Sequence, residues 1–317
     1  MLKRSSIRKI CIGAFCLLIL LIVYLFPSKN NSENLTIDTK YTITNVSDVI
    51  YLLDSNDYVA RLCVSLSSTE PIDKALEAIS YITENSEYSK LILNGFKPII
   101  PSGTKIISHD LKDGNFKINF SKELLDIEPK YEMKMIEAIV YTLTSIESIK
   151  NVTILVEGNI LTNLPSSKEY LPNPIDRNFG INKKYNIDSI KGLTKTTMYY
   201  LSKNNDLYYY IPVTKISNDT REKIEIIINE LTSSPIHETN LMSYLNSEAA
   251  LQNYEFLDKG LNIDFNNAIL SDITSHNILE EVTYAINLSI KDNYDVNSVM
   301  YTVNKEKIAT FDLKNLE

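Results

Sequence analysis

The sequence predicts an α+β fold: two tandem two-layer domains, each with helices packed on one face of a small mixed or antiparallel sheet, after an N-terminal transmembrane helix. Three observations predict it. The chain has 317 residues, 44% of them hydrophobic, which suffices for two domains with cores of their own. One long apolar run lies close to the N-terminus. After it, strand and helix patterns occur twice, at a spacing of about 145–149 residues.

The apolar run begins at Ile10 and ends at Phe26, and basic residues precede it in a short tip, residues 1–9. Its length is near the lower limit for a bilayer-spanning helix, and the positive charges keep the tip in the cytoplasm. We therefore expect an uncleaved, single-pass signal anchor in the cell membrane, with the bulk of the chain outside the cytoplasm. Signal-peptide cleavage and lipidation at Cys16 stay open as alternatives, although the flanking residues fit both poorly. Residues 27–45, rich in Ser, Asn, Thr and Lys, follow as a solvated stalk.

Each unit starts with a predicted β-hairpin. Residues 50–53 and 198–201 are apolar, and an Asn-Asp pair follows each stretch, at 56–57 and 205–206. Asn-Asp between apolar stretches is typical of a turn, so we expect each pair to connect two antiparallel strands.

Helices and strands then follow in the same order in both units. Apolar residues at i, i+3, i+4 and i+7 predict a first amphipathic helix; they are Ala75, Ala78, Ile79 and Ile82 in one unit and Ile224, Ile227, Ile228 and Leu231 in the other. Alternating apolar and polar residues predict a half-buried strand at 116–121 and at 261–266. A second helix, at 136–143 and 278–286, and a last strand, at 152–156 and 299–303, complete the units.

The repeats place the domain boundaries. We expect a first domain at 46–159, a connector at 160–195 and a second, diverged domain at 196–317. The connector contains three prolines, but Ile175, Phe179 and Ile181 are suited to docking, so we expect it to be ordered.

Four motifs of the first unit carry a family resemblance: Ile-Pro-Ser-Gly-Thr-Lys at 100–105, the strand at 116–121 with the following Lys-Glu-Leu-Leu, Glu-Ala-Ile-Val-Tyr at 137–141, and Val-Thr-Ile-Leu-Val-Glu-Gly at 152–158. Their order resembles the GerM domain family, which is named for sporulation and spore germination. The connector at 173–182 is similar to the stretch between the repeats of tandem members. The resemblance covers roughly residues 45–310; the second copy has Asn-Ser-Glu-Ala at 246–249 in place of the Pro-x-Gly-Thr turn.

The resemblance implies a non-enzymatic scaffold or interaction module outside the membrane, which helps to assemble or localise the septal complex between mother cell and forespore. It implies the membrane and envelope or septal sporulation proteins as partners, and a location in the septal membrane around the forespore. Its domains are similar to ring-building modules, so homo-oligomerisation is a hypothesis by analogy. The best-known member is a lipoprotein, whereas the residues before Cys16 do not form a typical lipoprotein signal.

Composition argues against several classes of function. The net charge of −8 argues against a nucleic-acid partner. With only 8 Gly, 3 Cys and 3 His, we expect no cofactor-binding, metal-binding or catalytic residues. The neighbouring carboxylates Asp126 and Glu128, or Glu280 and Glu281, show no sign of a catalytic pair, and His109, His237 and His276 stand alone. Cys63 lies in a strand-like stretch and is expected to be a small buried residue.

Tyrosines gather in the second predicted hairpin and supply the candidate interface residues Tyr199, Tyr208 and Tyr210. Alternate side chains of a strand point to opposite faces, so one set could pack in the core while the other is exposed as an anchor for a partner protein. The plain alternative is the strand propensity of tyrosine. Two other functions stay open: a module that binds peptidoglycan or another envelope ligand, and, less favoured, a cell-wall hydrolase.

Overall fold

The computed structural model describes residues 48–233, 239–272, 274, 276–314 and 316. Residues Val46–Glu317 form one compact unit. The expected anchor from Ile10 through Phe26, Cys16 and the stalk at 27–45 lie outside the described residues. Among the residues that are described, no helix is long and apolar enough to cross a membrane.

The first repeat begins with an antiparallel hairpin of β1 (Asp48–Asp54) and β2 (Val59–Val64), as its Asn-Asp turn predicts. The elements that follow are α2 (Pro71–Tyr81), β3 (Phe96–Lys97), β4 (Ile106–Lys112), β5 (Asn115–Phe120), α3 (Glu132–Leu143), β6 (Asn151–Val156) and β7 (Asn159–Ile160). Short 3-10 turns lie at Tyr88–Leu91, Lys122–Leu125 and Pro129–Tyr131.

The second repeat has the same order of main elements, without a counterpart of β3 among its described residues and with an added ribbon before its second helix. Its hairpin is β9 (Thr194–Asn204) with β10 (Leu207–Ser217), followed by α4 (Lys223–Thr232), β11 (Leu251–Leu257), β12 (Gly260–Phe265), a 3-10 turn (Asn267–Ile269), a small ribbon of β13 (Leu270–Asp272) and β14 (Asn277–Ile278), α5 (Glu280–Asn293), β15 (Ser298–Val303) and β16 (Glu306–Asp312). The connector contributes a 3-10 turn (Arg177–Phe179) and β8 (Lys184–Asn186).

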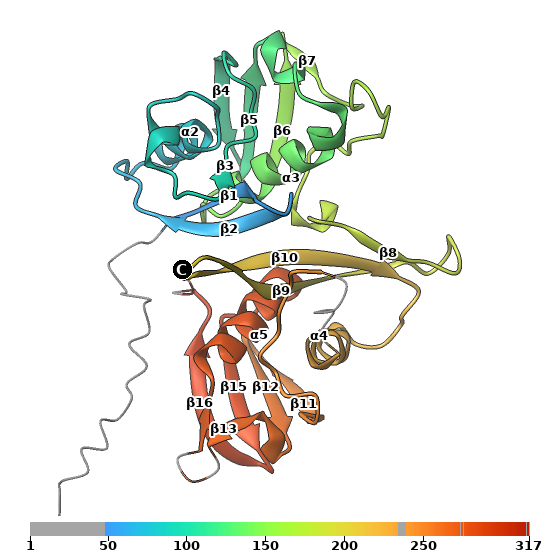
Figure 1. The fold of residues 1–317 in the computed structure, drawn as a ribbon. Coiled ribbons are helices and arrows are strands. Elements are labelled where there is room, and N and C mark those ends of the chain that lie inside the picture. Colours follow the sequence, from blue (N-terminus) through green and yellow to red (C-terminus); the bar gives the residue numbers. More distant parts are fainter. Residues whose placement is uncertain (1–47, 234–238, 273, 275, 315, 317) are drawn as a thin grey trace, which may run out of the picture. The chain divides into compact units, whose positions relative to one another are not determined.

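Each repeat contains a four-stranded sheet, in the order β4-β5-β6-β7 or β11-β12-β15-β16 (Figure 1). The two central strands run parallel in both sheets because a long helix, α3 or α5, connects them. The alternation in β5 has the expected consequence: Phe116, Ile118 and Phe120 are fully buried, whereas Lys117 is exposed.

The central helix of each repeat lies between two layers of strands. Helix α3 is buried on every side over Met135–Leu143, since it contacts β1 as well as β6. Helix α5 holds β9 through a hydrogen bond from Tyr199 N–H to Ser289 Oγ (3.0 Å), and it meets β15 where Tyr301 Oη donates to Asn287 Oδ1 (2.9 Å). The α+β class is therefore as predicted, but the two-layer description is incomplete, because the hairpin adds a further layer.

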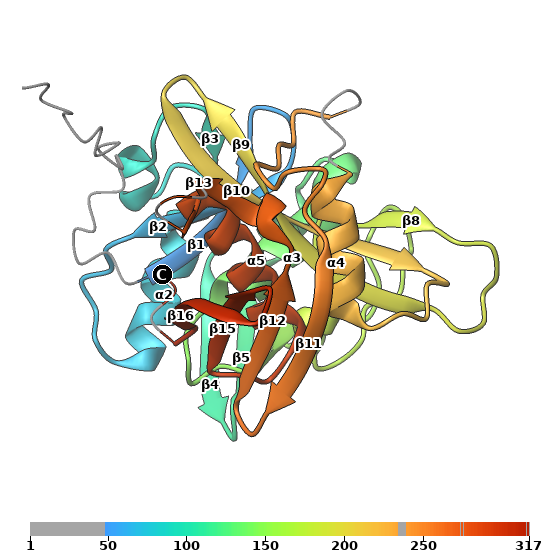
Figure 2. The ribbon, with the colours of Figure 1, turned by 90° about the horizontal axis from the view of Figure 1, so that it is seen from below.

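The two hairpins belong to one sheet, which the repeat pattern does not predict. Its order is β3-β1-β2-β10-β8, with β9 on the other side of β10, and β2 meets β10 in antiparallel pairing of Arg61 with Tyr210. These two residues are 149 positions apart (210 − 61) and occupy equivalent places in the two repeats. The hairpins of the first and second repeat lie side by side in both views (Figures 1 and 2).

The connector is ordered, as expected, since Ile175, Phe179 and Ile181 are buried. Ile181 and Thr214 of β10 exchange hydrogen bonds, Ile181 N–H to Thr214 Oγ1 and Thr214 N–H to Ile181 O, both 2.9 Å. Gly180 allows this approach: its φ is +83°, and a Cβ atom there would lie 3.0 Å from Thr214 Cγ2. The connector thus packs directly onto the second repeat.

Candidate interaction surfaces and the junction between the repeats

Arg177 of the connector is the charged centre of the junction between the repeats. Its Nη1 lies 2.5 Å from Asp292 Oδ1 at the end of α5, and its other nitrogens donate to Thr144 Oγ1, Ser145 Oγ and the Tyr141 carbonyl at the end of α3. A cation at a helix C-terminus interacts favourably with the free carbonyls there. One guanidinium therefore joins the last turns of both central helices.

Two equivalent tyrosines meet beside this ion pair. The hydroxyls of Tyr51 and Tyr199 lie 3.2 Å apart, and Tyr199 Oη donates to Asp292 Oδ2 at 2.7 Å. Burial alone would lower the pKa of Arg177, but Asp292 and the surrounding tyrosines outweigh it and hold that pKa well above its ordinary value. Burial, and next Asp292, raise the pKa of Tyr199 far above its usual range. The arginine stays charged and the tyrosine stays a neutral donor.

Asn182 bridges the two hairpins where they join. Its Nδ2 donates to the carbonyls of Val59 in β2 and Pro212 in β10, both at 2.8 Å, while its Oδ1 accepts from Val59 N–H at 2.9 Å. A second bridge runs from Tyr209 Oη in β10 to the buried Asp54 at the end of β1 (2.9 Å). Every donor and acceptor in these bridges has a hydrogen-bond partner. The junction is therefore held by a buried polar network and not by apolar packing alone.

The structure corrects the candidate interface tyrosines. Tyr199 is 1% exposed and Tyr210 is 5% exposed, so neither can contact a partner protein, and the expectation of surface anchors is wrong for both. They pack with Leu201, Ala285 and Leu288, which holds the second hairpin against α5. Tyr208 is half-buried, and the Lys203 Nζ lies 5.0 Å from its ring centroid. A partner contact at Tyr208 stays a prediction.

The other chemistry-bearing residues do not converge. Asp126, Glu128 and Glu280 are exposed, Glu281 is half-buried, His109 and His276 are exposed, and His237 lies outside the described residues. In the described part of the chain, no group of three His, Cys, Asp or Glu side chains is arranged to hold a metal ion.

The expectation for Cys63 is wrong. The residue is exposed, and its Sγ accepts a hydrogen bond from Nη1 of the buried Arg61 at 3.2 Å. Leu62 points to the other face of β2, so side chains at 61–66 do alternate between the two faces. The face that carries Cys63 is exposed at that position, whereas an apolar cysteine is expected to be buried.

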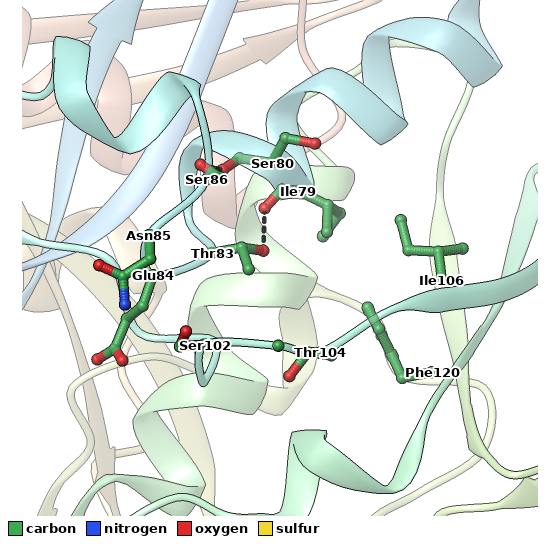
Figure 3. A pocket seen from close by; sticks show the side chains of 11 residues that line it. Ile79, Ser80, Thr83, Glu84, Asn85, Ser86, Ser102, Thr104, Ile106 and Phe120 are labelled. Carbon is green, nitrogen blue, oxygen red and sulfur yellow. Dashed lines mark hydrogen bonds between the residues drawn. The ribbon is translucent and has the colours of Figure 1, made fainter.

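The Pro-Ser-Gly-Thr turn lines a pocket with a volume of about 330 Å³ between α2 and the start of β4 (Figure 3). Thr83 Oγ1 at its wall already donates to Ile79 O at 2.7 Å, as the dashed line in Figure 3 marks.

The turn itself is formed in both repeats. Thr104 N–H donates to Pro101 O (3.2 Å), and Ala249 N–H donates to Asn246 O in the second repeat (2.9 Å). The degenerate sequence at 246–249 therefore keeps the turn, which is structural in both repeats.

Three seven-residue strands lie at open edges of the two four-stranded sheets in the described part of the chain: β4 in the first repeat, and β11 and β16 in the second. The exposed side chains of β4 and β11 include polar ones, such as Ser108 and Asp110 on β4 and Asn253 on β11. They also include the apolar Ile107, Phe256 and Leu257. An open strand edge presents backbone donors and acceptors that can pair with another chain.

These observations define a tandem α+β repeat protein whose two units are fixed to each other by a buried polar junction. The family model for Germane, sporulation and spore germination, matches residues 49–162. Over 260 residues the chain is 30% identical to the spore germination protein GerM of Bacillus subtilis (strain 168), covering 80% of this chain and 70% of the relative. The solved tandem GerMN domains of the sporulation protein GerM from Bacillus subtilis match with a TM-score of 0.75 at 28% identity, over 82% of this chain and 91% of that one. The chain belongs to the GerM family of sporulation and spore germination proteins, and the resemblance in its sequence is confirmed.

Proposed function

We propose that this protein is a membrane-anchored, extracytoplasmic scaffold that presents two GerM domains as one body and helps to assemble or localise the septal complex between mother cell and forespore. The observation that carries the proposal is the junction. It fixes the two repeats to each other through Arg177, Asp292 and Asn182. It also pairs the edge of β2 with the edge of β10, so these two edges are not available to a partner. Each repeat keeps an equivalent open edge for partners, β4 in the first and β11 in the second, and both edges belong to one body.

Strand addition at these edges is the mode of contact that fits them best. Main-chain hydrogen bonds supply affinity there, and the exposed polar side chains on either side supply selectivity. The partners we propose are envelope or septal sporulation proteins, and self-association through the same edges is included. Nucleic acid is not among them, because the net charge is −8.

A fluorescent fusion to the full chain in sporulating cells tests the location. We expect enrichment at the engulfing septal membrane; a uniform membrane signal would contradict the proposal. Photo-cross-linking residues in place of Ser108 on β4 and Asn253 on β11 test the contact, and the same residue in place of the exposed Glu87 is the matched control. Cross-links to proteins from the edge positions and none from the control are expected. Recovery of peptidoglycan fragments instead would favour the envelope-ligand module.

A further inference from the structure

The loop between β8 and β9 exposes apolar side chains at three regularly spaced positions. Ile187 is 39% exposed, Ile190 89% and Leu193 42%. Because Thr194 pairs with Ser217, this loop lies at the end of the β9–β10 hairpin opposite its Asn-Asp turn. Figures 1 and 2 both show it standing out beyond β8. Exposed aliphatic side chains of this kind mark a surface that another apolar phase covers.

The loop has a defined conformation because the side chain of Asn218 forms hydrogen bonds with its backbone. Asn218, directly after β10, accepts through Oδ1 from the N–H groups of Asp188 (2.8 Å) and Ser189 (3.0 Å). Its Nδ2 donates to the carbonyls of Ser189 and Lys191, both at 2.8 Å. Four hydrogen bonds to the Asn218 side-chain amide fix the turn that contains Ile190. The exposure of the Ile190 side chain therefore follows from a defined backbone conformation.

The charge around the loop is opposite to that of the chain. Residues 184–195 carry Lys184, Lys191 and Lys195 against Asp188, a net charge of +2, whereas the whole chain carries −8. Lys191 and Lys195 are exposed. Basic residues next to exposed aliphatic ones are the combination that binds an anionic lipid surface.

Two other stretches with exposed apolar residues lack this charge. Leu91 is 66% exposed, but the stretch 84–97 around it has two acidic and two basic residues and is neutral. Phe256 and Leu257 lie in the stretch 255–259 with Glu255, Asp258 and Lys259, a net charge of −1. Of these three stretches, the loop after β8 has the charge that complements an anionic surface.

We propose that the loop at 187–193 docks on the anionic phospholipid bilayer, with Ile190 and Leu193 inserted among the acyl chains and the lysines on the headgroup phosphates. This inference rests on the proposed membrane location and adds to it a second point of contact, which orients the two GerM domains on the bilayer. One loop with three aliphatic residues and its lysines binds a bilayer with a modest affinity that is measurable at excess lipid, and the tether of the full chain raises its effective concentration at the membrane.

The test uses residues 46–317, which form one compact unit and correspond to the tandem domains that were solved as a separate chain in the relative. The chain has no tryptophan, so Ile190→Trp creates a single tryptophan probe in the loop, and Leu91→Trp is the matched control at an exposed aliphatic residue elsewhere. Vesicles of phosphatidylcholine with one-third phosphatidylglycerol are compared with vesicles of phosphatidylcholine alone.

We expect the Ile190→Trp emission to shift to shorter wavelength, and to be quenched by brominated acyl chains, with the anionic vesicles only, while Leu91→Trp stays unchanged. In co-sedimentation, Ile190→Ser lowers vesicle binding about tenfold, and Leu91→Ser leaves it unaltered. At 89% exposure the Ile190 side chain adds little to folding, so the variant retains its thermal midpoint.

An unshifted Ile190→Trp spectrum overturns the inference, and so does an equal shift in both kinds of vesicle, because the lysines would then have no role. Cross-links from this loop to a protein instead of lipid in sporulating cells also overturn it. None of these results touches the septal location of the full chain, which the fluorescent fusion measures separately.

Discussion

Replacing Asp292 by alanine should destabilise residues 46–317 and weaken the coupling between their two repeats. The Asp292 side chain is 6% exposed and that of Arg177 is 25% exposed, so the replacement leaves a mostly buried guanidinium without its carboxylate. Removing one partner of a buried ion pair costs about 3–5 kcal/mol. The Tyr199 hydroxyl loses its acceptor as well, worth about 1 kcal/mol, while the partial exposure of Arg177 lets water compensate in part. We expect a net loss of about 3–4 kcal/mol.

Urea unfolding followed by circular dichroism measures this loss. With a slope of about 3 kcal/mol per molar urea for a unit of this size, the midpoint falls by about 1 M. We also expect the single transition to broaden or split, because the junction is what makes the repeats unfold together. Asp295→Ala is the control: it removes a surface ion pair to Lys259 whose side chains are 93% and 54% exposed, and it should leave the midpoint unchanged.

A second replacement distinguishes the loss of the attraction between Arg177 and Asp292 from the cost of leaving the Arg177 charge without a partner. Arg177→Met in the Asp292→Ala background removes the uncompensated guanidinium, so we expect it to restore part of the stability, whereas the same replacement in the native chain lowers it. The reasoning is refuted if Asp292→Ala costs less than about 1 kcal/mol, or if the two replacements add without compensation.

Three further predictions concern the connector. Burial acts to raise the pKa of Glu132, but hydrogen bonds from residues 166 and 167 outweigh it and lower that pKa. The stabilisation is therefore present above the unfolded-state pKa and is lost as pH falls through the folded-state pKa. Amide protection factors at 160–172, which are corrected for the intrinsic exchange rate, should fall on acidification, and Glu132→Gln should abolish that pH dependence. Asn182→Ala removes three hydrogen bonds from the connector to the two hairpins and should cost about 2–4 kcal/mol in the same urea assay, and a cost below about 1 kcal/mol would contradict the bridging role. Gly180→Ala places a Cβ at φ +83° and 3.0 Å from Thr214 Cγ2, so a thermal midpoint several degrees lower is expected, and an unchanged midpoint would show that the connector can shift.

Local sequence patterns predicted the helices and strands that are buried on one face by a single neighbouring layer. The strict alternation at 116–121 and 261–266 appears as β5 and β12, and the two apolar stripes appear as α2 and α4. In the second repeat the predicted second helix begins too early: Ile278 lies in β14, and α5 starts at Glu280. Turn chemistry located both hairpins, because Asn and Asp adopt the positive φ values seen at Asp57 and Asn205.

The junction could not be predicted, because its contacts join residues far apart in sequence. Periodicity tells which residues of a strand share a face, but not which element covers that face. In β9, Met198 and Tyr200 face the main core while Tyr199 and Leu201 face α5, so both sides are covered. Arg177 and Asp292 carry no local signal either, since a charged residue in a connector or at a helix end is ordinarily solvated.

The pairing of Arg61 with Tyr210, and the contact of Tyr51 with Tyr199, join residues that are equivalent in the two repeats. Contacts between equivalent residues on antiparallel strands are the mark of a local two-fold axis, the arrangement by which identical subunits form a closed dimer. This chain holds that arrangement within one polypeptide, because the edges of β2 and β10 that would pair in a dimer already pair with each other. An arc or ring formed from copies of this chain would therefore contain an even number of GerM domains.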